Sequence, residues 1–445
     1  MDRKLIFNYT TLGCKVNQYE SEVIAKSLAD AGWSTASGIE NADLFIVNTC
    51  AVTQKASMQS RQAIRKAIRS NPNARIVVTG CYAQVEPDEI KKIKGVHYII
   101  GNADKHRIPE IITSEKEKDS PPPEFFPLTI QHDIKHENKF QPMLVMGSSC
   151  KRTRPLLKIQ DGCDNFCTYC IVPYARGRSR SMDPEKVLDS IKLIKRSGYR
   201  EVVLSGIALG RYGLDLVSPT TLSDLLKQIN FSQPIDRVRL SSIEPEELSG
   251  DIIKTVADSD MFCNHFHIPL QSGDDLILKK MHRPYSRSFF KDLVIKIYEM
   301  IPDAAIGVDV LIGFPGETKQ SFENTYSLIE ELPVTYLHVF PFSGRKGTPA
   351  NTYPDKVPSQ VIKDRCLKMR EIGTNKKIEF YKKLIGKKVE LLIEGARSKS
   401  TGRLKGTTSN YVPVFINGKD DLKNCIVQAR VDELCGKNAV FGTIL

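Results

Sequence analysis

The sequence lacks the features of a membrane or secreted protein. It has no stretch of about 18 consecutive apolar residues, so a transmembrane helix is not expected. The amino terminus, residues 1–9, has too few apolar side chains for a signal peptide. We therefore expect a cytoplasmic protein with no membrane partner. In that compartment the 11 cysteines are expected to bind metal rather than to form disulfides.

Acidic residues are fewer than basic ones. The 445 residues include 52 acidic and 64 basic side chains, a net charge of +12 that is compatible with a nucleic-acid partner. No acidic residue lies between Asp43 and Glu86. Within this stretch Arg61, Arg65 and Arg69 recur every four residues along a predicted helix, and this stripe could bind RNA phosphates. A solvated helix face is the alternative.

One motif lacks the fourth ligand that a structural zinc site needs. Cys163, Cys167 and Cys170 have the spacing C-x3-C-x2-C, and the nearest upstream histidines are His132 and His136. Structural zinc normally takes four protein ligands. Three thiolates can instead hold a 4Fe-4S cluster whose remaining iron is open to a small molecule. We favour the cluster; a zinc loop or buried thiols are the alternatives.

A second set of three cysteines follows three apolar runs near the amino terminus. These runs end at Cys14, Cys50 and Cys81, and helical patterns separate them. The alternation predicts an open parallel α/β sheet over residues 1–112. Ligands bind at the carboxyl edge of such sheets, so three thiolates there predict a second cluster. The alternative is three unrelated core cysteines. A fourth run ends at Asn102 without a cysteine.

Residues 113–150 are expected to be a linker, and residues 151–377 a central α/β domain. Six strand candidates alternate with helical patterns there, at residues 156–159, 201–204, 237–240, 265–269, 305–312 and 336–340. Six units predict an open (β/α)6 barrel, part of a TIM-like barrel, which suits a macromolecular substrate. Barrel enzymes place their chemistry at strand carboxyl ends. The candidate contacts for a small molecule are Ser205, Gly206, Ile207, Ser241, Glu244 and Gln271.

The last segment, residues 378–445, changes to short alternating runs. Strands are predicted at residues 389–393, 411–416, 426–431 and 439–444, which indicates a small all-β barrel. Residues 376–445 hold 14 basic and 7 acidic side chains. This excess favours an RNA-holding module, and a solubilising surface is the alternative.

These motifs together resemble the radical S-adenosylmethionine (SAM) methylthiotransferase family. The phrases that carry the resemblance are Asn48-Thr-Cys50, Thr79-Gly-Cys81, the run from Gly162 to Pro173, and the run from Phe266 to Gly273. The plan of the chain is also similar: a methylthiotransferase domain, a radical-SAM core and a C-terminal TRAM domain.

The opening residues 11–22, with Lys15-Val16, look like the MtaB branch of this family, which acts on N6-threonylcarbamoyladenosine (t6A) in tRNA. Sister branches that modify isopentenyladenosine in tRNA or a ribosomal protein are the alternatives. A non-enzymatic, metal-dependent RNA-binding protein is a third. Ala208 stands where relatives commonly have a polar residue, which leaves a side-chain contact at that position unsupported.

The resemblance implies a mechanism. Cys163, Cys167 and Cys170 would hold the 4Fe-4S cluster that splits SAM into methionine and a 5′-deoxyadenosyl radical. The strand-end residues of the barrel would contact SAM. The second cysteine set would hold an auxiliary 4Fe-4S cluster that carries sulfur, and a second SAM would methylate that sulfur.

The radical would remove hydrogen from carbon 2 of t6A at tRNA position 37, giving ms2t6A. Such a C–H bond is too strong for acid–base chemistry, so a radical cofactor is needed. An external one-electron donor, flavodoxin- or ferredoxin-like, is implied.

Overall fold

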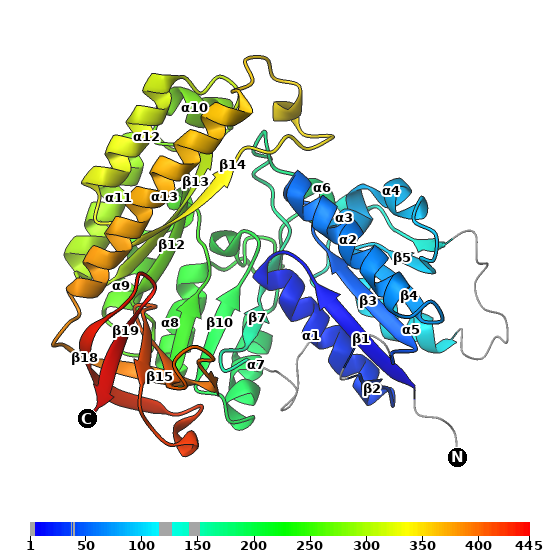
Figure 1. The fold of residues 1–445 in the computed structure, drawn as a ribbon, viewed down its shortest axis with the longest axis horizontal. Coiled ribbons are helices and arrows are strands. Elements are labelled where there is room, and N and C mark those ends of the chain that lie inside the picture. The colour runs from blue at the N-terminus through cyan, green and yellow to red at the C-terminus, as the bar shows by residue number, and fades with distance from the viewer. Residues whose placement is uncertain (1–4, 37, 39–40, 115–126, 142–151) are drawn as a thin grey trace. The chain divides into compact units, whose positions relative to one another are not determined.

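The computed structural model describes residues 5–36, 38, 41–114, 127–141 and 152–445 (Figure 1). The chain forms two compact units, each built from separate stretches of sequence. The N-terminal unit comprises residues 1–149, 160–182 and 343–351, and the barrel unit comprises residues 150–159, 183–342 and 352–445. In the described part of the chain, no helix is both long and apolar enough to cross a membrane.

The N-terminal unit contains a parallel sheet with strand order β2-β1-β3-β4-β5-β6. The strands are β1 Ile6–Thr11, β2 Ser34–Thr35, β3 Leu44–Thr49, β4 Arg75–Gly80, β5 Tyr98–Ile100 and β6 Leu128–Ile130. The predicted open parallel sheet is therefore confirmed. The short strands β2 and β6 extend it at its two edges, and β6 lies within the stretch expected as a linker.

Helices cover both faces of this sheet (Figure 1). They are α1 Lys15–Asp30, α2 Gln54–Ser70, α3 Cys81–Val85, α4 Pro87–Lys91 and α5 Ile108–Ser114, with short 3-10 turns η1 Lys105–Arg107 and η3 Ile134–His136. Side chains alternate along β3, so Leu44 and Ile46 pack with α1 and α5, whereas Phe45 and Val47 pack with α2 and α3. This alternation gives the sheet two apolar cores.

The same unit includes a short hairpin around the C-x3-C-x2-C motif. Strands β8 Gln160–Asp161 and β9 Arg180–Ser181 pair in antiparallel fashion, and α6 Val172–Arg176 lies between them in sequence. Gly162 has φ +78°, and a Cβ there would lie 1.8 Å from the carbonyl oxygen of Arg178. Glycine is therefore needed where the chain turns into the cysteine loop. Residues 343–351, ending in η6 Pro349–Asn351, complete the unit.

The barrel unit contains six parallel strands in two three-stranded sheets. The first sheet, β11-β10-β7, comprises β7 Leu156–Lys158, β10 Glu201–Ser205 and β11 Arg237–Leu240; the second comprises β12 His265–Gln271, β13 Ala305–Ile312 and β14 Tyr336–Pro341. An isolated bridge pairs Val238 of β11 with Phe262, just before β12. All six predicted strands are confirmed, and within the described part of the chain neither β7 nor β14 pairs with a second strand.

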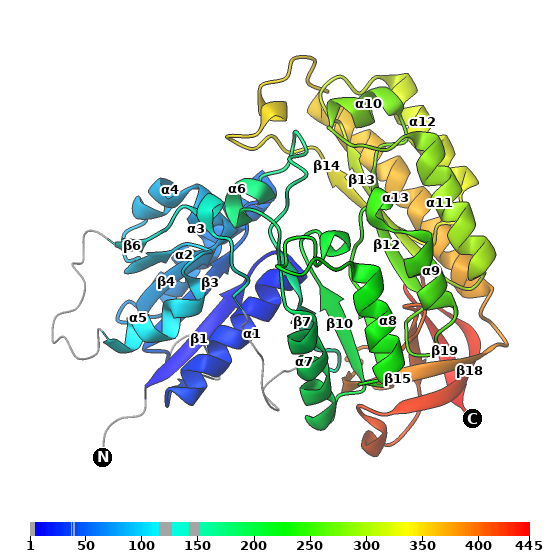
Figure 2. The ribbon, with the colours of Figure 1, turned by 180° about the vertical axis from the view of Figure 1, so that it is seen from behind.

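Helices follow the strands of this partial barrel (Figure 2). They are α7 Pro184–Arg196, α8 Leu222–Ser232, α9 Gly250–Ala257, α10 Asp275–Lys280, α11 Arg287–Met300, α12 Lys319–Glu331 and α13 Ser359–Lys382, with turns η4 Leu209–Arg211 and η5 Pro245–Glu247. Asp183 caps the amino terminus of α7, and its carboxylate accepts hydrogen bonds from the backbone N–H groups of Glu185 and Lys186. Pro184 fits the first helical position because its missing N–H has no partner there anyway.

The C-terminal segment forms a closed five-stranded barrel in the order β15-β16-β17-β19-β18, with the turn η7 Asp420–Leu422. The strands are β15 Lys388–Arg397, β16 Leu404–Thr408, β17 Pro413–Ile416, β18 Ile426–Cys435 and β19 Ala439–Ile444. The small barrel was predicted correctly, but strand β16 was missed. It has a single large apolar residue, Leu404, and its Gly406 lets Leu391 of β15 pack closely, so alternation could not reveal it.

Two arginines of β11 attach this small barrel to the central strands. Arg239 donates to the backbone carbonyls of Ser409 and Thr408, at 2.8 and 3.1 Å, and its Nε donates to Glu201 at 2.8 Å. Arg237 donates to the carbonyl of Thr407 at 3.4 Å. Burial alone would raise the pKa of Glu201, but the two guanidinium groups hold that pKa below its ordinary value.

Candidate iron–sulfur and SAM sites

The first cysteine set lies at the carboxyl edge of the N-terminal sheet. Cys14 caps α1, Cys50 follows β3, and Cys81 follows β4 as the first residue of α3. Gly13 has φ +97°, and a Cβ there would lie 2.9 Å from the Sγ atom of Cys50, so only glycine lets these loops approach. Burial raises the pKa of Cys50 to about 12, and the neighbouring Cys81 and Cys14 thiolates contribute. Three thiols from separate strand ends are thus brought together.

The second set lies on the loop between β8 and α6. Cys163 N–H donates to the carbonyl of Gly177 at 3.0 Å, and Cys170 N–H donates to the carbonyl of Cys167 at 2.9 Å. The backbone N–H of Asn165 points at the Sγ atom of Cys163, at 3.5 Å. Main-chain hydrogen bonds therefore fix the path of this loop, which belongs to the same compact unit as the first cysteine set.

Arg176 connects the two cysteine sets. It ends α6, six residues after Cys170 in sequence, and its side chain is buried. Its Nη1 lies 2.8 Å from Asp161 Oδ1 beside the cysteine loop, and 3.0 Å from Glu20 Oε1 on α1. Its Nη2 donates to Asn17 Oδ1, also on α1, at 2.5 Å. A single guanidinium thus ties the cysteine loop to the helix that Cys14 caps.

A second buried cation completes this ion network. Lys105 Nζ lies 2.5 Å from Glu20 Oε2, and the side chains of Lys105 and Glu20 are 2% and 4% exposed. The charge of Arg176 lowers the pKa of Cys50, against the larger effect of burial. Positive charge in a buried position favours the thiolate, which is the form of cysteine that binds metal.

Asn102 is a site residue that the sequence interpretation did not identify. It follows β5, the strand that ends without a cysteine, and its Nδ2 lies 3.7 Å from Cys81 Sγ. The same Nδ2 donates to the carbonyl of Ala175 at 2.7 Å. Its place at the fourth strand end was the available signal. Asn102 directs an N–H toward a sulfur of the first cysteine set, and Asn165 does the same for the second set. Hydrogen bonds to the sulfur ligands are a common feature of iron–sulfur clusters. The donor set therefore fits two such clusters.

The candidate SAM contacts come from three neighbouring strands of the barrel unit. Ser205 ends β10, Ser241 follows β11, and Gln271 ends β12. Ser241 N–H donates to the carbonyl of Leu204 at 3.0 Å, so the ends of β10 and β11 lie side by side. The hydroxyl of Ser241 is buried without a hydrogen-bond partner among the described residues. It is available to a ligand.

The remaining candidates lie in the loops that follow. Gly206 and Ile207 come directly after β10 and are partly exposed. Glu244 lies 2.9 Å from Arg283, from its Oε2 to Nη2, and burial raises its pKa. The six candidates thus share one edge, formed by the carboxyl ends of β10, β11 and β12.

Of the arginine stripe on α2, one residue lines a pocket and two do not. Arg61 donates to the hydroxyl of Tyr82 at 2.8 Å and lines an open pocket of about 660 Å³ in the N-terminal unit. Other basic residues on its wall are Lys55, Arg345 and Lys346. Arg65 and Arg69 are exposed further along α2 and do not line this pocket.

Comparison with known proteins identifies the family. Residues 6–101 match the model described as uncharacterized protein family UPF0004, and residues 157–329 match the radical SAM superfamily. The chain is 37% identical to the threonylcarbamoyladenosine tRNA methylthiotransferase MtaB of Bacillus subtilis, over 95% of this chain and 93% of that protein. The chain belongs to the methylthiotransferase family of radical SAM enzymes. Membership implies a 4Fe-4S cluster and SAM as cofactors.

Other methylthiotransferases resemble this one to a similar degree. MtaB of Rickettsia prowazekii is 39% identical over 92% of this chain and 90% of its own. The tRNA-2-methylthio-N(6)-dimethylallyladenosine synthase of Clostridium botulinum is 37% identical over 94% of this chain and 92% of its own. The radical SAM methyltransferase TsrM from Kitasatospora setae has a similar fold, with a TM-score of 0.57 and 15% identity over 78% of this chain and 74% of its own.

Proposed function

We propose that this methylthiotransferase installs a methylthio group on carbon 2 of t6A at position 37 of tRNA, giving ms2t6A. The observation that carries the proposal is the match to proteins named MtaB, 36–39% identical over 86–95% of this chain. The phrase Lys15-Val16 in the opening segment also supports it. The Clostridium relatives act on dimethylallyladenosine by their names, so isopentenyladenosine tRNA is the competing substrate.

Each cysteine set is proposed to hold one 4Fe-4S cluster. Cys163, Cys167 and Cys170 would hold the cluster that binds SAM, and Cys14, Cys50 and Cys81 the auxiliary one. When bound, these groups supply radical generation and sulfur, with two SAM molecules used per turnover.

The protein's own part is to hold and orient these groups. Asn165 and Asn102 each donate an N–H toward a sulfur of one set, and Arg176 and Lys105 form buried ion pairs with Glu20 of α1. Both cysteine sets belong to one compact unit, which supports a shared task. SAM contacts are proposed for Ser205, Gly206, Ile207, Ser241, Glu244 and Gln271.

The tRNA is proposed to contact two basic surfaces. One is the TRAM-like barrel at residues 378–445, and the other is the stripe of Arg61, Arg65 and Arg69 in the methylthiotransferase domain at residues 1–112. The core that lies between them in sequence, residues 151–377, is proposed to carry the SAM chemistry. The enzyme is proposed to act in the cytoplasm, with a flavodoxin- or ferredoxin-like protein as its one-electron donor.

The test is anaerobic turnover of two defined tRNAs. Protein reconstituted with iron and sulfide, reduced by dithionite and given SAM, is offered tRNA bearing t6A or isopentenyladenosine. Mass analysis of the nucleosides should find ms2t6A and no methylthio product from the second tRNA. The reverse preference would place the protein in the dimethylallyladenosine branch, and no product from either tRNA would contradict the assignment.

A further inference from the structure

The sheet β12-β13-β14 has one apolar face and one polar face. Phe266, Ile268 and Val308 are fully or almost fully buried. Alternation places the neighbouring side chains of these strands on the opposite face. They include His267 on β12, Asp309 on β13 and His338 on β14. Buried polar groups are costly unless they are hydrogen-bonded.

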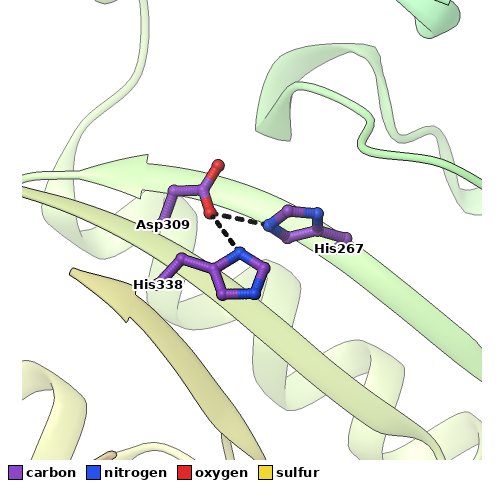
Figure 3. Close-up of side chains that lie close together, drawn as sticks. All are labelled: His267, Asp309 and His338. Carbon is purple, nitrogen blue, oxygen red and sulfur yellow. Dashed lines mark hydrogen bonds and ion pairs between the residues drawn. The ribbon is translucent and has the colours of Figure 1, made fainter. Parts of the chain in front are cut away.

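The two imidazoles converge on one carboxylate oxygen of Asp309 (Figure 3). His267 Nε2 lies 2.8 Å from Asp309 Oδ1, and His338 Nδ1 lies 3.1 Å from the same atom. The two imidazoles hold the pKa of Asp309 below its ordinary value, although burial alone would raise it. Among the described residues, none bonds to the far nitrogens, Nδ1 of His267 and Nε2 of His338. Both are open to a ligand.

The cluster opens to solvent on the side of His338. The side chain of His338 is 49% exposed, against 15% for His267 and 19% for Asp309. Two aromatic rings of the same strand flank it: the ring centroids of Tyr336 and Phe340 lie 5.3 and 6.3 Å from that of His338. Phe340 is itself exposed. Partly exposed rings along one strand form a surface on which an unpaired RNA base can stack.

We propose that His338 and His267, held in place by Asp309, bind the threonylcarbamoyl group on N6 of the target adenine while the base stacks on the adjoining rings. This inference rests on t6A as the proposed substrate and names the residues that select it. The threonylcarbamoyl group carries a carboxylate, a hydroxyl and a urea. An imidazole that donates one N–H to the shared carboxylate keeps a lone pair on its far nitrogen, which can accept a hydrogen bond from the hydroxyl or a urea N–H of this group.

The same arrangement would discriminate against an apolar N6 substituent. A dimethylallyl group offers no hydrogen bond, so binding it here would strip water from the imidazoles without replacement. The three ligand atoms lie within 4.8 Å of one another, so a divalent cation is the competing occupant. The separations of 2.8 and 3.1 Å between nitrogen and oxygen are those of hydrogen bonds, which favours the nucleoside.

The experiment measures the affinity of reconstituted protein for anticodon stem-loop RNAs that differ only at position 37. The wild type should bind the t6A stem-loop about tenfold or more tightly than the unmodified one. His338→Phe keeps a flat ring but removes both nitrogens, and Asp309→Asn keeps the shape but removes the charge. Both should reduce this ratio to near one. His338→Gln, which retains one hydrogen-bond acceptor and an N–H donor, should restore part of it.

The matched control is His106→Phe, at an exposed histidine of η1 in the N-terminal unit, which should leave the ratio unchanged. Iron content and thermal unfolding verify that each variant is folded. An unchanged ratio in folded His338→Phe and Asp309→Asn overturns the inference. So does one equivalent of zinc that the wild type retains and His338→Phe loses. If the wild type prefers t6A RNA but never methylthiolates it, the proposed function fails while this binding site stands.

Discussion

The guanidinium of Arg176 lies 3.0 Å from the carboxylate of Glu20, and both side chains are buried. Arg176 follows the cysteine loop of the radical-SAM motif, whereas Glu20 belongs to the helix that begins beside Cys14. The contact therefore couples the two cysteine sets through one ion pair. Buried charges of this kind are destabilising when only one partner is removed.

The first prediction is that Arg176→Met selectively impairs the auxiliary site. It removes one buried partner of Glu20, removes positive charge near the first cysteine set, and breaks the contact between α6 and α1. Iron per chain after anaerobic reconstitution should fall by about half. Arg178→Met is the matched control, because Arg178 is exposed and, among the residues that the structure describes, pairs only with Asp164. Full iron content in Arg176→Met would contradict the coupling.

The second prediction concerns metal stoichiometry. Two sets of three cysteines should bind two clusters, about eight irons per chain. Replacing Cys163, Cys167 and Cys170 together by alanine should leave about four. Iron and sulfide analysis after gel filtration tests this. Four irons in the unaltered protein, or zinc that resists chelation, would show that only one of the sets binds a cluster.

The third prediction separates the roles of the two sets. Cys50→Ala should still cleave SAM to 5′-deoxyadenosine, because the loop of the second set is intact, but should form no ms2t6A. Cys167→Ala should form neither product. Chromatography of both products from the same reaction distinguishes the variants. Methylthiolated tRNA from Cys50→Ala would remove the sulfur-carrying role from the first set.

The fourth prediction concerns Glu247, which lies 3.0 Å from Arg211, from Oε1 to Nε. Burial, with repulsion from Glu244 and Glu246, raises the pKa of Glu247 to about 7. The folded state therefore holds this proton more tightly than the unfolded state, whose pKa is near 4.5. Stability should be lost as pH rises from about 4.5 to about 7, by up to about 3 kcal/mol.

Glu247→Gln removes this titration. Relative to the wild type, its midpoint of thermal unfolding should rise between about pH 5 and about pH 8, where the wild type carries the buried charge. Comparing the two proteins at each pH cancels the other titrating groups. A difference that stays constant across this range would show that Glu247 does not titrate as expected.

The fifth prediction concerns the C-terminal barrel. Lys399, Lys419 and Lys437 are exposed there and form no ion pair among the described residues. Replacing all three by glutamine should weaken tRNA binding. The slope of the logarithm of the binding constant against the logarithm of the salt concentration should become shallower by roughly 0.7 to 0.9 per lost phosphate contact. Substitution is preferable to truncation, because Arg239 loses buried partners if the barrel is removed. An unchanged salt slope would indicate that the stripe of arginines on α2, rather than the barrel, makes the main contact with RNA.

The sequence predicted those parts of the protein that follow from local pattern. The runs that end at Cys50 and Cys81 are short, apolar and bounded by turn residues, so strand ends and cysteines could be placed together. The six central strands alternate with helices in the same way. Strand β16 was not predicted, because Leu404–Thr408 has a single large apolar side chain and therefore no alternating pattern. Pairing within the closed barrel stabilises it as a strand nevertheless.

The side chains that complete the sites could not be predicted from pattern. Arg176 meets Glu20 across 156 residues of sequence, and His267 meets Asp309 across 42. Each of these residues alone reads as an ordinary polar position. Only the pairing of strands and the packing of α6 on the sheet reveal that they share a site.

Arg237 and Arg239 hold the small barrel through the carbonyl oxygens of residues 407–409 rather than through its side chains. Every amino acid has a backbone carbonyl, so these hydrogen bonds depend little on which residues occupy positions 407–409. The outer surface of the barrel is thereby free to diversify. If the barrel binds tRNA as proposed, exchange of its surface lysines would change tRNA binding while the attachment to the central strands stays the same.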